Sequence, residues 1–279
     1  MPNAVRALAE RFAKESGAKA ALFYGSILRT GDLDGVIDFY LLTDGPAPAI
    51  WPVVSYREAD FEGQTLRAKI ATMPIATFAS AARGEGMDTT IWTRFVQPCA
   101  LAWVADSGTE QAIVEAVSGA IGTASRFAAA LGPTHGKPAE YWRALFRATY
   151  AAEFRVEAGG REERIISHDP ERYAALLPLG WVRTGIAFAV GGEQLTPVLA
   201  PAARRSILAA WRRRQRLGKF LNIARLCKAA FTFDGAAQYA AWKIERHTGV
   251  AVPLTHWQER HPILAAPGVL WRVWRKRAA

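Results

Sequence analysis

The first hundred residues combine one stretch of helical spacing with several short apolar runs. Apolar residues recur at helical spacing from residue 5 to residue 16 and are followed by Gly17, which predicts an amphipathic opening helix. Apolar runs at 20–24, 36–42 and 66–73 predict three strands. A helix followed by several strands favours a mixed α/β fold of the α+β kind, with a mixed sheet.

The spacing becomes helical and alanine-rich after residue 105. It predicts helices over 109–131 and 140–157 and a basic helical region over 202–230, while a stretch with Gly and Pro at 179–201 is a linker candidate. We therefore expect three regions: an α/β domain over 1–105, a helical region over 106–200 that flanks the candidate site described below, and a basic C-terminal region over 201–279.

Charge is distributed unevenly along the 279 residues, whose net charge is +10. Residues 1–100 carry ten Lys and Arg against eleven Asp and Glu, whereas residues 101–279 carry twenty-five against fourteen. A basic C-terminal half favours a phosphate-bearing partner: nucleic acid, an anionic membrane surface or a phosphorylated small molecule. A solvated basic surface without a partner is the alternative.

Other features restrict the class of protein. No apolar run approaches the length of a membrane span, and the N-terminus lacks the pattern of a secretory signal, so we expect a cytoplasmic protein. Cys99 and Cys227 lie far apart without the spacing of a metal site, and we expect both to be buried thiols.

The candidate chemistry lies where the first strand ends. Gly25 and Ser26 follow an apolar strand, so glycine would let the backbone approach phosphates, backbone N–H groups at the following helix start would bind them, and the Ser26 hydroxyl could donate to them. Arg29 follows three residues later, and Asp38 in the next strand offers a carboxylate for magnesium. An ordinary strand–turn–helix connection, with Asp38 at a strand edge, is the alternative.

This pattern resembles the Gly-Ser…Asp-x-Asp signature of the DNA polymerase β-like nucleotidyltransferase superfamily. Val36 stands where the first Asp of that pair would be, so a second metal ligand would have to come from Asp34 or Asp32.

One branch of the superfamily is more similar: the mitochondrial-type, peripheral phosphatidate cytidylyltransferases (CDP-diacylglycerol synthases). That family also has an apolar residue two positions before its strand Asp. The similar residues here are Tyr24-Gly25-Ser26, Val36-Ile37-Asp38-Phe39 and Asp44. Further similarities follow in the same order, in the strand with Lys69, in the helix with Tyr150 and Arg155, and at Glu162-Glu163. The resemblance covers most of the chain and is strong at residues 22–44 and 146–166.

The resemblance implies transfer of a cytidylyl group from CTP to phosphatidic acid, with magnesium, giving CDP-diacylglycerol and pyrophosphate. It implies that Tyr24, Gly25, Ser26, Arg29, Lys69 and Arg155 bind the nucleotide, that Asp38, Ser26 and Lys69 act in catalysis, and that Asp38 and Asp34 hold the metal.

It also implies peripheral association with an anionic membrane surface, and no nucleic-acid partner is expected. The tail from Gly268 to Arg277 contains Trp271 and Trp274 among basic residues, which predicts either an interfacial anchor or a helix packed on the core.

Two other functions remain open on the sequence alone. A nucleotidyltransferase acting on RNA or on a small molecule would use the basic C-terminal half to bind its acceptor, although no RNA-binding motif is recognisable. The second alternative is a catalytically degenerate nucleotide-binding protein. Val36, in place of the first Asp of the superfamily signature, is an observation in its favour.

Overall fold

A five-stranded mixed sheet forms the first part of the fold. The computed structural model describes residues 1–45, 51–152, 160–260, 264–265, 268 and 271. The strands are β1 (Ala18–Tyr24), β2 (Val36–Thr43), β3 (Val53–Phe61), β4 (Gln64–Pro74) and β5 (Cys99–Val104). Their spatial order is β3-β4-β2-β1-β5; β2 and β4 are parallel, and the other neighbouring pairs are antiparallel.

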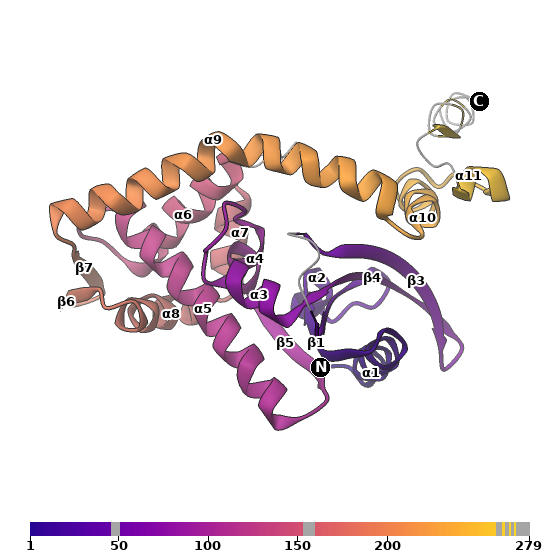
Figure 1. Ribbon diagram of the computed structural model, residues 1–279, viewed down its shortest axis with the longest axis horizontal. Coiled ribbons are helices and arrows are strands. Elements are labelled where there is room, and N and C mark those ends of the chain that lie inside the picture. The colour runs from indigo at the N-terminus through magenta and orange to yellow at the C-terminus, as the bar shows by residue number, and fades with distance from the viewer. Residues whose placement is uncertain (46–50, 153–159, 261–263, 266–267, 269–270, 272–279) are drawn as a thin grey trace.

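Helix α1 (Asn3–Ser16) covers one face of this sheet (Figure 1). Its apolar stripe, including Val5, Leu8 and Phe12, is buried against Phe23 and Phe39 of the sheet. The helix ends at Gly17, whose φ of 65° is the left-handed conformation that glycine adopts at low cost. The predicted opening helix and its buried face are therefore confirmed.

Helices from the middle of the chain form the layer on the other face of the sheet. They are α3 (Ile75–Ala82), α4 (Thr90–Phe95), α5 (Ser107–Leu131), α6 (Pro138–Ala152), α7 (Arg161–His168) and α8 (Pro170–Arg183). Within this layer, α3 and α5 contact the strands. Helix α5 contacts α3, α4, α6, α8 and α9, so it is the central helix of this layer. Its N-terminus is capped by Asp106, whose carboxylate accepts a hydrogen bond from the Thr109 N–H.

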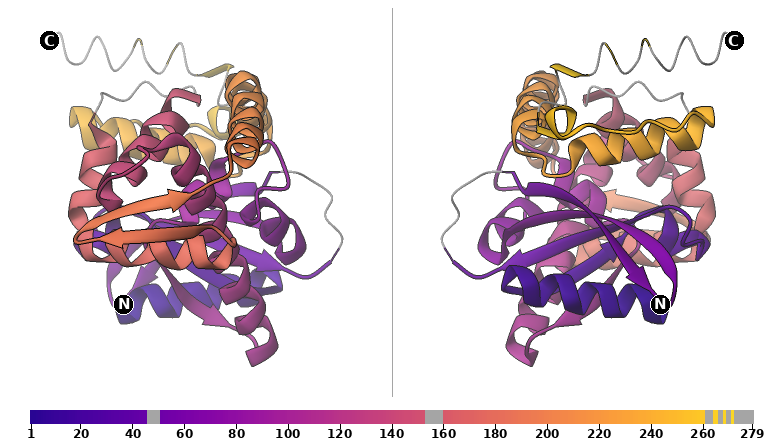
Figure 2. Two further views of the ribbon diagram at one scale, coloured as in Figure 1. Left: turned by 90° about the vertical axis from the view of Figure 1, so that its left-hand side faces the viewer. Right: turned by 90° about the vertical axis from the view of Figure 1, so that its right-hand side faces the viewer.

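The last part of the chain begins with a hairpin of β6 (Ala187–Gly191) and β7 (Gln194–Val198), seen from the front in Figure 2, left. Helix α9 (Pro201–Thr232) then runs along one edge of the molecule, and α10 (Ala236–Thr248) returns over β3 (Figure 1). A short helix, α11 (His256–Arg260), follows. Most of the predicted tail helix at 268–277 lies outside the described residues.

The core is continuous across the three regions predicted from the sequence. One buried cluster joins Leu22 and Tyr40 of the sheet to Trp142 of α6, Trp181 of α8 and Trp211 of α9. The predicted mixed α/β fold, with a sheet followed by helical regions, is confirmed. Among the described helices, none combines the length and the apolar composition that a membrane crossing requires.

Several sequence predictions need correction. Strands β3 and β5 were not predicted, and the linker candidate at 179–201 contains the end of α8 and the β6–β7 hairpin. Cys227 is exposed rather than buried. Cys99 is partly exposed, but burial raises the pKa of its thiol to about 11, so little of it is the reactive thiolate at neutral pH.

Candidate functional site

The sheet places the candidate residues in one row across its strands. Strand pairing puts Cys99 opposite Tyr24, Tyr24 opposite Asp38, Asp38 beside Lys69, and Lys69 opposite Tyr56. Residues paired in this way point to the same face of a sheet. Asp38 therefore lies at the centre of the row, between a tyrosine and a lysine from the two neighbouring strands.

Gly25 connects this row to helix α2 (Ser26–Thr30) through an unusual backbone conformation. Its φ of 96° and ψ of −161° are accessible essentially only to glycine. A Cβ atom at this position would lie 2.6 Å from Oδ2 of Asp38, so the backbone of the turn packs directly against that carboxylate. Because α2 has only five residues, its dipole contributes little, and side chains must supply most of the charge at this site.

A cavity of about 260 Å³ opens beside this turn. Six of the residues predicted from the sequence line it: Tyr24, Gly25, Ser26, Arg29, Asp38 and Lys69. The rest of the lining comes from α4, from the residues that follow it, and from α6, namely Thr90, Thr93, Arg94, Gln97, Pro98 and Tyr150. Residues separated by more than a hundred positions in the sequence therefore meet at one polar cavity.

Arg94 is the residue of this second group with the clearest contacts. Its guanidinium carbon lies 5.0 Å from the centre of the Tyr24 ring and 5.9 Å from that of Tyr40, both within cation–π range. Its Nη1 donates a hydrogen bond of 3.4 Å to the Tyr24 hydroxyl. Two aromatic rings thus hold a permanently charged, planar group at the wall of the cavity.

Burial dominates the electrostatics of Asp38 and Lys69. It raises the pKa of Asp38 above its ordinary value, although the positive charges of Lys69, Arg94 and Arg29 oppose that rise. Burial lowers the pKa of Lys69. The negative charge of Asp38 opposes this decrease, whereas the positive charges of Arg94 and Lys243 lower the pKa of Lys69 further. Several cations and one carboxylate therefore share a poorly solvated space, which favours an anionic ligand.

Helix α10 brings further cationic and aromatic groups close to this row. The Nζ atom of Lys69 lies 5.8 Å from the centre of the Tyr239 ring, and that of Lys243 lies 5.9 Å from the same ring. Burial, and then the charge of Asp38, raises the pKa of Tyr239. The Tyr239 and Lys243 side chains therefore lie beside this row.

Two predicted site residues are not brought to the cavity by the described structure. Asp34 is exposed in the loop between α2 and β2 and is absent from the cavity lining; its carbonyl accepts a hydrogen bond from Arg246. Arg155 lies outside the described residues. Its role, like that of Asp34 as a metal ligand, stays a prediction.

The cavity offers hard oxygen donors suited to magnesium. Within the described residues, no group of three or more His, Cys, Asp or Glu side chains could hold a metal ion. Asp38 is the acidic residue of the cavity lining, and Ser26 adds a hydroxyl oxygen. Since magnesium retains water and takes phosphate oxygens as ligands, this small donor set fits one ion that binds together with a nucleotide.

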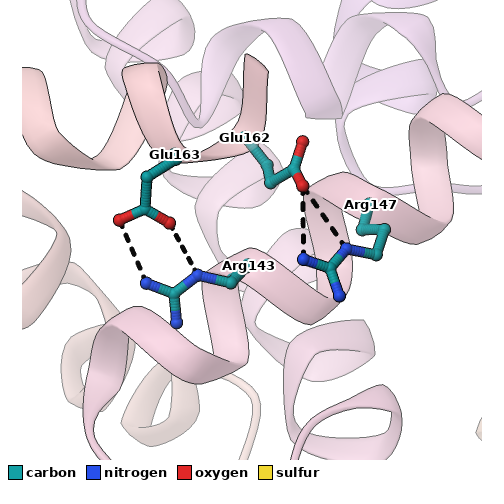
Figure 3. Close-up of polar contacts among 4 residues, drawn as sticks. All are labelled: Arg143, Arg147, Glu162 and Glu163. Atoms are coloured by element: carbon teal, nitrogen blue, oxygen red, sulfur yellow. Dashed lines mark hydrogen bonds and ion pairs between the residues drawn. The ribbon is translucent and has the colours of Figure 1, made fainter. Parts of the chain in front are cut away.

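The Glu162-Glu163 pair, which contributed to the family resemblance, lies on a helix–helix contact (Figure 3). Glu163 binds Arg143 through two hydrogen bonds of 2.7 and 3.1 Å, and Glu162 binds Arg147 at 3.3 Å. These pairs join the first turn of α7 to α6. Both glutamates therefore pair with arginines of α6, the helix that carries Tyr150, and neither of them lines the cavity.

Comparisons with known proteins give little additional information. No family model matches the chain, and no curated protein does. Among solved structures, the chain is similar to a nucleotidyltransferase-like protein from Exiguobacterium sibiricum 255-15, with a TM-score of 0.28 and 10% sequence identity over 96% of this chain and 88% of that chain. Values this low do not by themselves establish a shared fold or activity.

Proposed function

We propose that this protein is a nucleotidyltransferase that uses CTP and magnesium to convert phosphatidic acid into CDP-diacylglycerol at an anionic membrane surface. The observation that carries the proposal is the packing of the Gly25-Ser26 turn against Asp38, in a cavity that Arg29, Lys69 and Arg94 also line. Glycine backbone, hydroxyl, carboxylate and several cations are the groups that nucleotidyl transfer requires. The identities of donor and acceptor come from the family resemblance of residues 22–44 and 146–166.

The reaction is a substitution at the α-phosphorus of CTP. An oxygen of the phosphatidate phosphate forms a bond to that phosphorus, and the bond from it to the bridging oxygen of pyrophosphate breaks. A phosphomonoester is largely deprotonated near neutral pH, so the step needs no dedicated general base. The protein has to align the two substrates and neutralise the charge that develops on the phosphoryl oxygens.

Each cavity residue has a role that its position allows. Ser26 would donate its hydroxyl to a phosphate oxygen of CTP, while Arg29, Lys69 and Arg94 would neutralise the triphosphate. Asp38 would hold magnesium, which when bound adds positive charge next to the phosphates. Burial of Asp38 and Lys69 strengthens these interactions because little water screens them.

The test is transfer of radioactivity from CTP labelled at the α-phosphate to a lipid. The purified protein is incubated with labelled CTP, magnesium and vesicles that contain phosphatidic acid, and labelled CDP-diacylglycerol is expected. Asp38→Asn should lower the rate by about 100-fold or more, the scale on which loss of one preorganised polar group lowers kcat. Asp60→Asn is the matched control, because Asp60 is an exposed acid that binds Thr65 in the β3–β4 hairpin.

Each other outcome rejects a defined part of the proposal. Transfer to RNA or to a soluble small molecule, with none to phosphatidic acid, would reject the lipid acceptor but retain nucleotidyl transfer. CTP binding without turnover toward any of these acceptors would identify a degenerate nucleotide-binding protein. Equal rates for the wild type and Asp38→Asn would reject the role of the cavity.

A further inference from the structure

Helix α9 divides its basic residues between two sides. Nine Lys and Arg lie between positions 204 and 228, and four of them bind the rest of the protein. Arg204 donates to the carbonyls of Ala130 and Gly132, and Arg214 to those of Gly84 and Gly86. Arg225 donates to the Thr90 hydroxyl and Lys228 to the Trp51 carbonyl. These four cations are therefore satisfied by the fold.

The other five cations point away from the protein. They are Arg205, Arg212, Arg213, Arg216 and Lys219, and all five are exposed. In the described part of the chain, no side-chain hydrogen bond or ion pair involves them. There is also no acidic residue from Gln194 to Phe233 that could neutralise them locally. This side of α9, called here the outer face, carries positive charge that no described acidic residue pairs.

Large apolar side chains are exposed on the same helix and among the same cations. Phe220 is 72% exposed, Ile223 is 49% exposed and Leu217 is 45% exposed. Their spacing of three residues places them along neighbouring turns, interleaved with Arg213, Arg216 and Lys219. Exposed apolar groups in this setting cost free energy in water unless a partner covers them.

The helix is also placed to meet an extended surface. It contains 32 residues, and a helix of that length is about 48 Å long. Figure 1 shows it along the upper edge of the molecule, and Figure 2 shows it at that edge from both sides. A long helix at the edge of the molecule can lie along a planar partner without displacing the core.

We propose that the outer face of α9 docks this protein on an anionic lipid bilayer. Arg and Lys would reach the lipid phosphates while Phe220, Ile223 and Leu217 enter the boundary between headgroups and acyl chains, as interfacial helices do. A polyanion without an apolar layer, such as nucleic acid, would satisfy the cations but leave Ile223 and Leu217 exposed. The purpose of this docking rests on the proposed function, because the proposed acceptor is a lipid. Vesicle binding itself is measured without enzymatic turnover.

Flotation of the full-length protein with vesicles tests the docking face. Binding is expected to vesicles of phosphatidylcholine mixed with phosphatidylglycerol, to weaken with added salt, and to be much weaker with phosphatidylcholine alone. The triple variant Arg212→Gln, Arg216→Gln and Lys219→Gln should bind about 100-fold more weakly. The double variant Phe220→Ser and Ile223→Ser should also lose most of its binding.

Matched control variants remove similar groups elsewhere. Arg6→Gln, Arg11→Gln and Lys14→Gln remove three exposed cations from α1, and Leu179→Ser with Val182→Ser removes two exposed apolar side chains from α8. Both controls should bind vesicles like the wild type. Transfer to a soluble, short-chain phosphatidate should be unchanged in the α9 variants, so failure of docking and failure of the proposed reaction are separate results.

Three outcomes would overturn the proposal. The first is unchanged vesicle binding by both α9 variants, including the case in which deletion of residues 268–279 alone abolishes it. The second is equal loss of binding in the α1 or α8 controls. The third is that the α9 variants lose affinity for a single-stranded RNA while their binding to anionic vesicles stays at the wild-type level.

Discussion

Arg94 is the residue whose position adds most to the candidate site beyond the sequence motif. The Tyr24 and Tyr40 rings hold its guanidinium beside the cavity, and its hydrogen bond to the Tyr24 hydroxyl restricts the orientation of that group. A planar cation held in this way needs little reorganisation when phosphates bind, which is the condition for strong stabilisation of a transition state.

We predict that Arg94→Ala lowers kcat/KM for CTP by about 100-fold, the scale found when one preorganised donor is removed. Arg94→Lys should recover only part of the loss, because lysine keeps the charge but lacks the planar guanidinium with its several N–H donors. Steady-state kinetics with varied CTP measures both variants, and thermal melting checks that each is folded. Arg11→Ala, an exposed residue of α1 paired with Glu15, is the control. Wild-type kinetics for Arg94→Ala would exclude a role at the site.

The part of the candidate site that could be predicted from the sequence lies within two strands and one turn. Tyr24, Gly25, Ser26, Arg29 and Asp38 are close in sequence, so strand alternation and a glycine turn were sufficient to place them together. Lys69 was associated with them through the family resemblance, and the parallel pairing of β2 with β4 sets it beside Asp38. These placements agree with the cavity lining, although their catalytic roles stay predictions.

Arg94 was missed because α4 is short and carries no motif. A signal was nevertheless present: Thr90, Thr93, Arg94 and Gln97 follow helical spacing on one side, opposite the buried Trp92 and Phe95. Such a polar stripe on a helix with a buried opposite side predicts a solvated or ligand-facing surface. Only the tertiary fold, however, brings that stripe to the Gly25-Ser26 turn.

At the scale of elements, strands β3 and β5 show why a local pattern can be insufficient. In β3 only Tyr56 and Ala59 are buried, and charged residues occupy the intervening positions, as expected of an edge strand. Strand β5 is a six-residue run with small apolar residues that suits a helix as well as a strand. Its pairing with β1 joins segments about eighty positions apart, which no local spacing encodes.

The start of helix α5 gives a prediction for pH dependence. The Thr109 N–H, and then its hydroxyl, hold the pKa of Asp106 below its ordinary value. Because the folded carboxyl binds a proton less readily than the unfolded one, its contribution to the free energy of unfolding is complete above the unfolded pKa, about 3.9. That contribution is lost as the pH falls through the lower folded pKa.

We therefore predict that Asp106→Ala destabilises the protein at neutral pH, whereas Asp106→Asn, which keeps a good capping side chain, retains most of the stability. The difference between wild type and Asp106→Ala should shrink below about pH 4 as the wild-type carboxyl becomes protonated. The difference between Asn and Ala should not change, since neither titrates. Urea unfolding over a pH series measures all three proteins. A wild-type–Ala difference that stays constant in acid would show that the ionised cap does not stabilise α5.

Across the whole molecule, helix α9 connects the basic character of the sequence to the fold. The charge asymmetry predicted a phosphate-bearing partner for the C-terminal half, but it could not separate cations that bind carbonyls from cations that face solvent. Arg214 illustrates the difference: it is buried and holds the loop that precedes α4, the helix that carries Arg94. The same helix thus supports the candidate site with one side, while the cations on its other side have no ion-pair partner among the described residues.

The continuity of the core predicts how the molecule unfolds. The face of the sheet that carries Leu22, Tyr40 and Met73 is covered by α3 and α5, and α5 lies outside residues 1–105. A fragment of residues 1–105 would lose α5, which packs on β1, β5, α3 and α4. We expect this loss of apolar burial to outweigh the small net stability that a domain typically has.

We predict that this fragment does not fold alone, although it contains most of the residues that line the cavity. Its nitrogen–proton correlation spectrum should show the narrow dispersion of an unfolded chain, and it should melt without a cooperative transition. The full-length protein, as the control, should give a dispersed spectrum and one main unfolding transition, because a single cluster joins its three regions. A dispersed spectrum and a cooperative melt from the fragment would instead show that α1 and the sheet form an independent unit. In that case the Gly25-Ser26 turn and Asp38 would form without the helices that follow residue 105. Those helices would only add Tyr150 to the cavity and support α9.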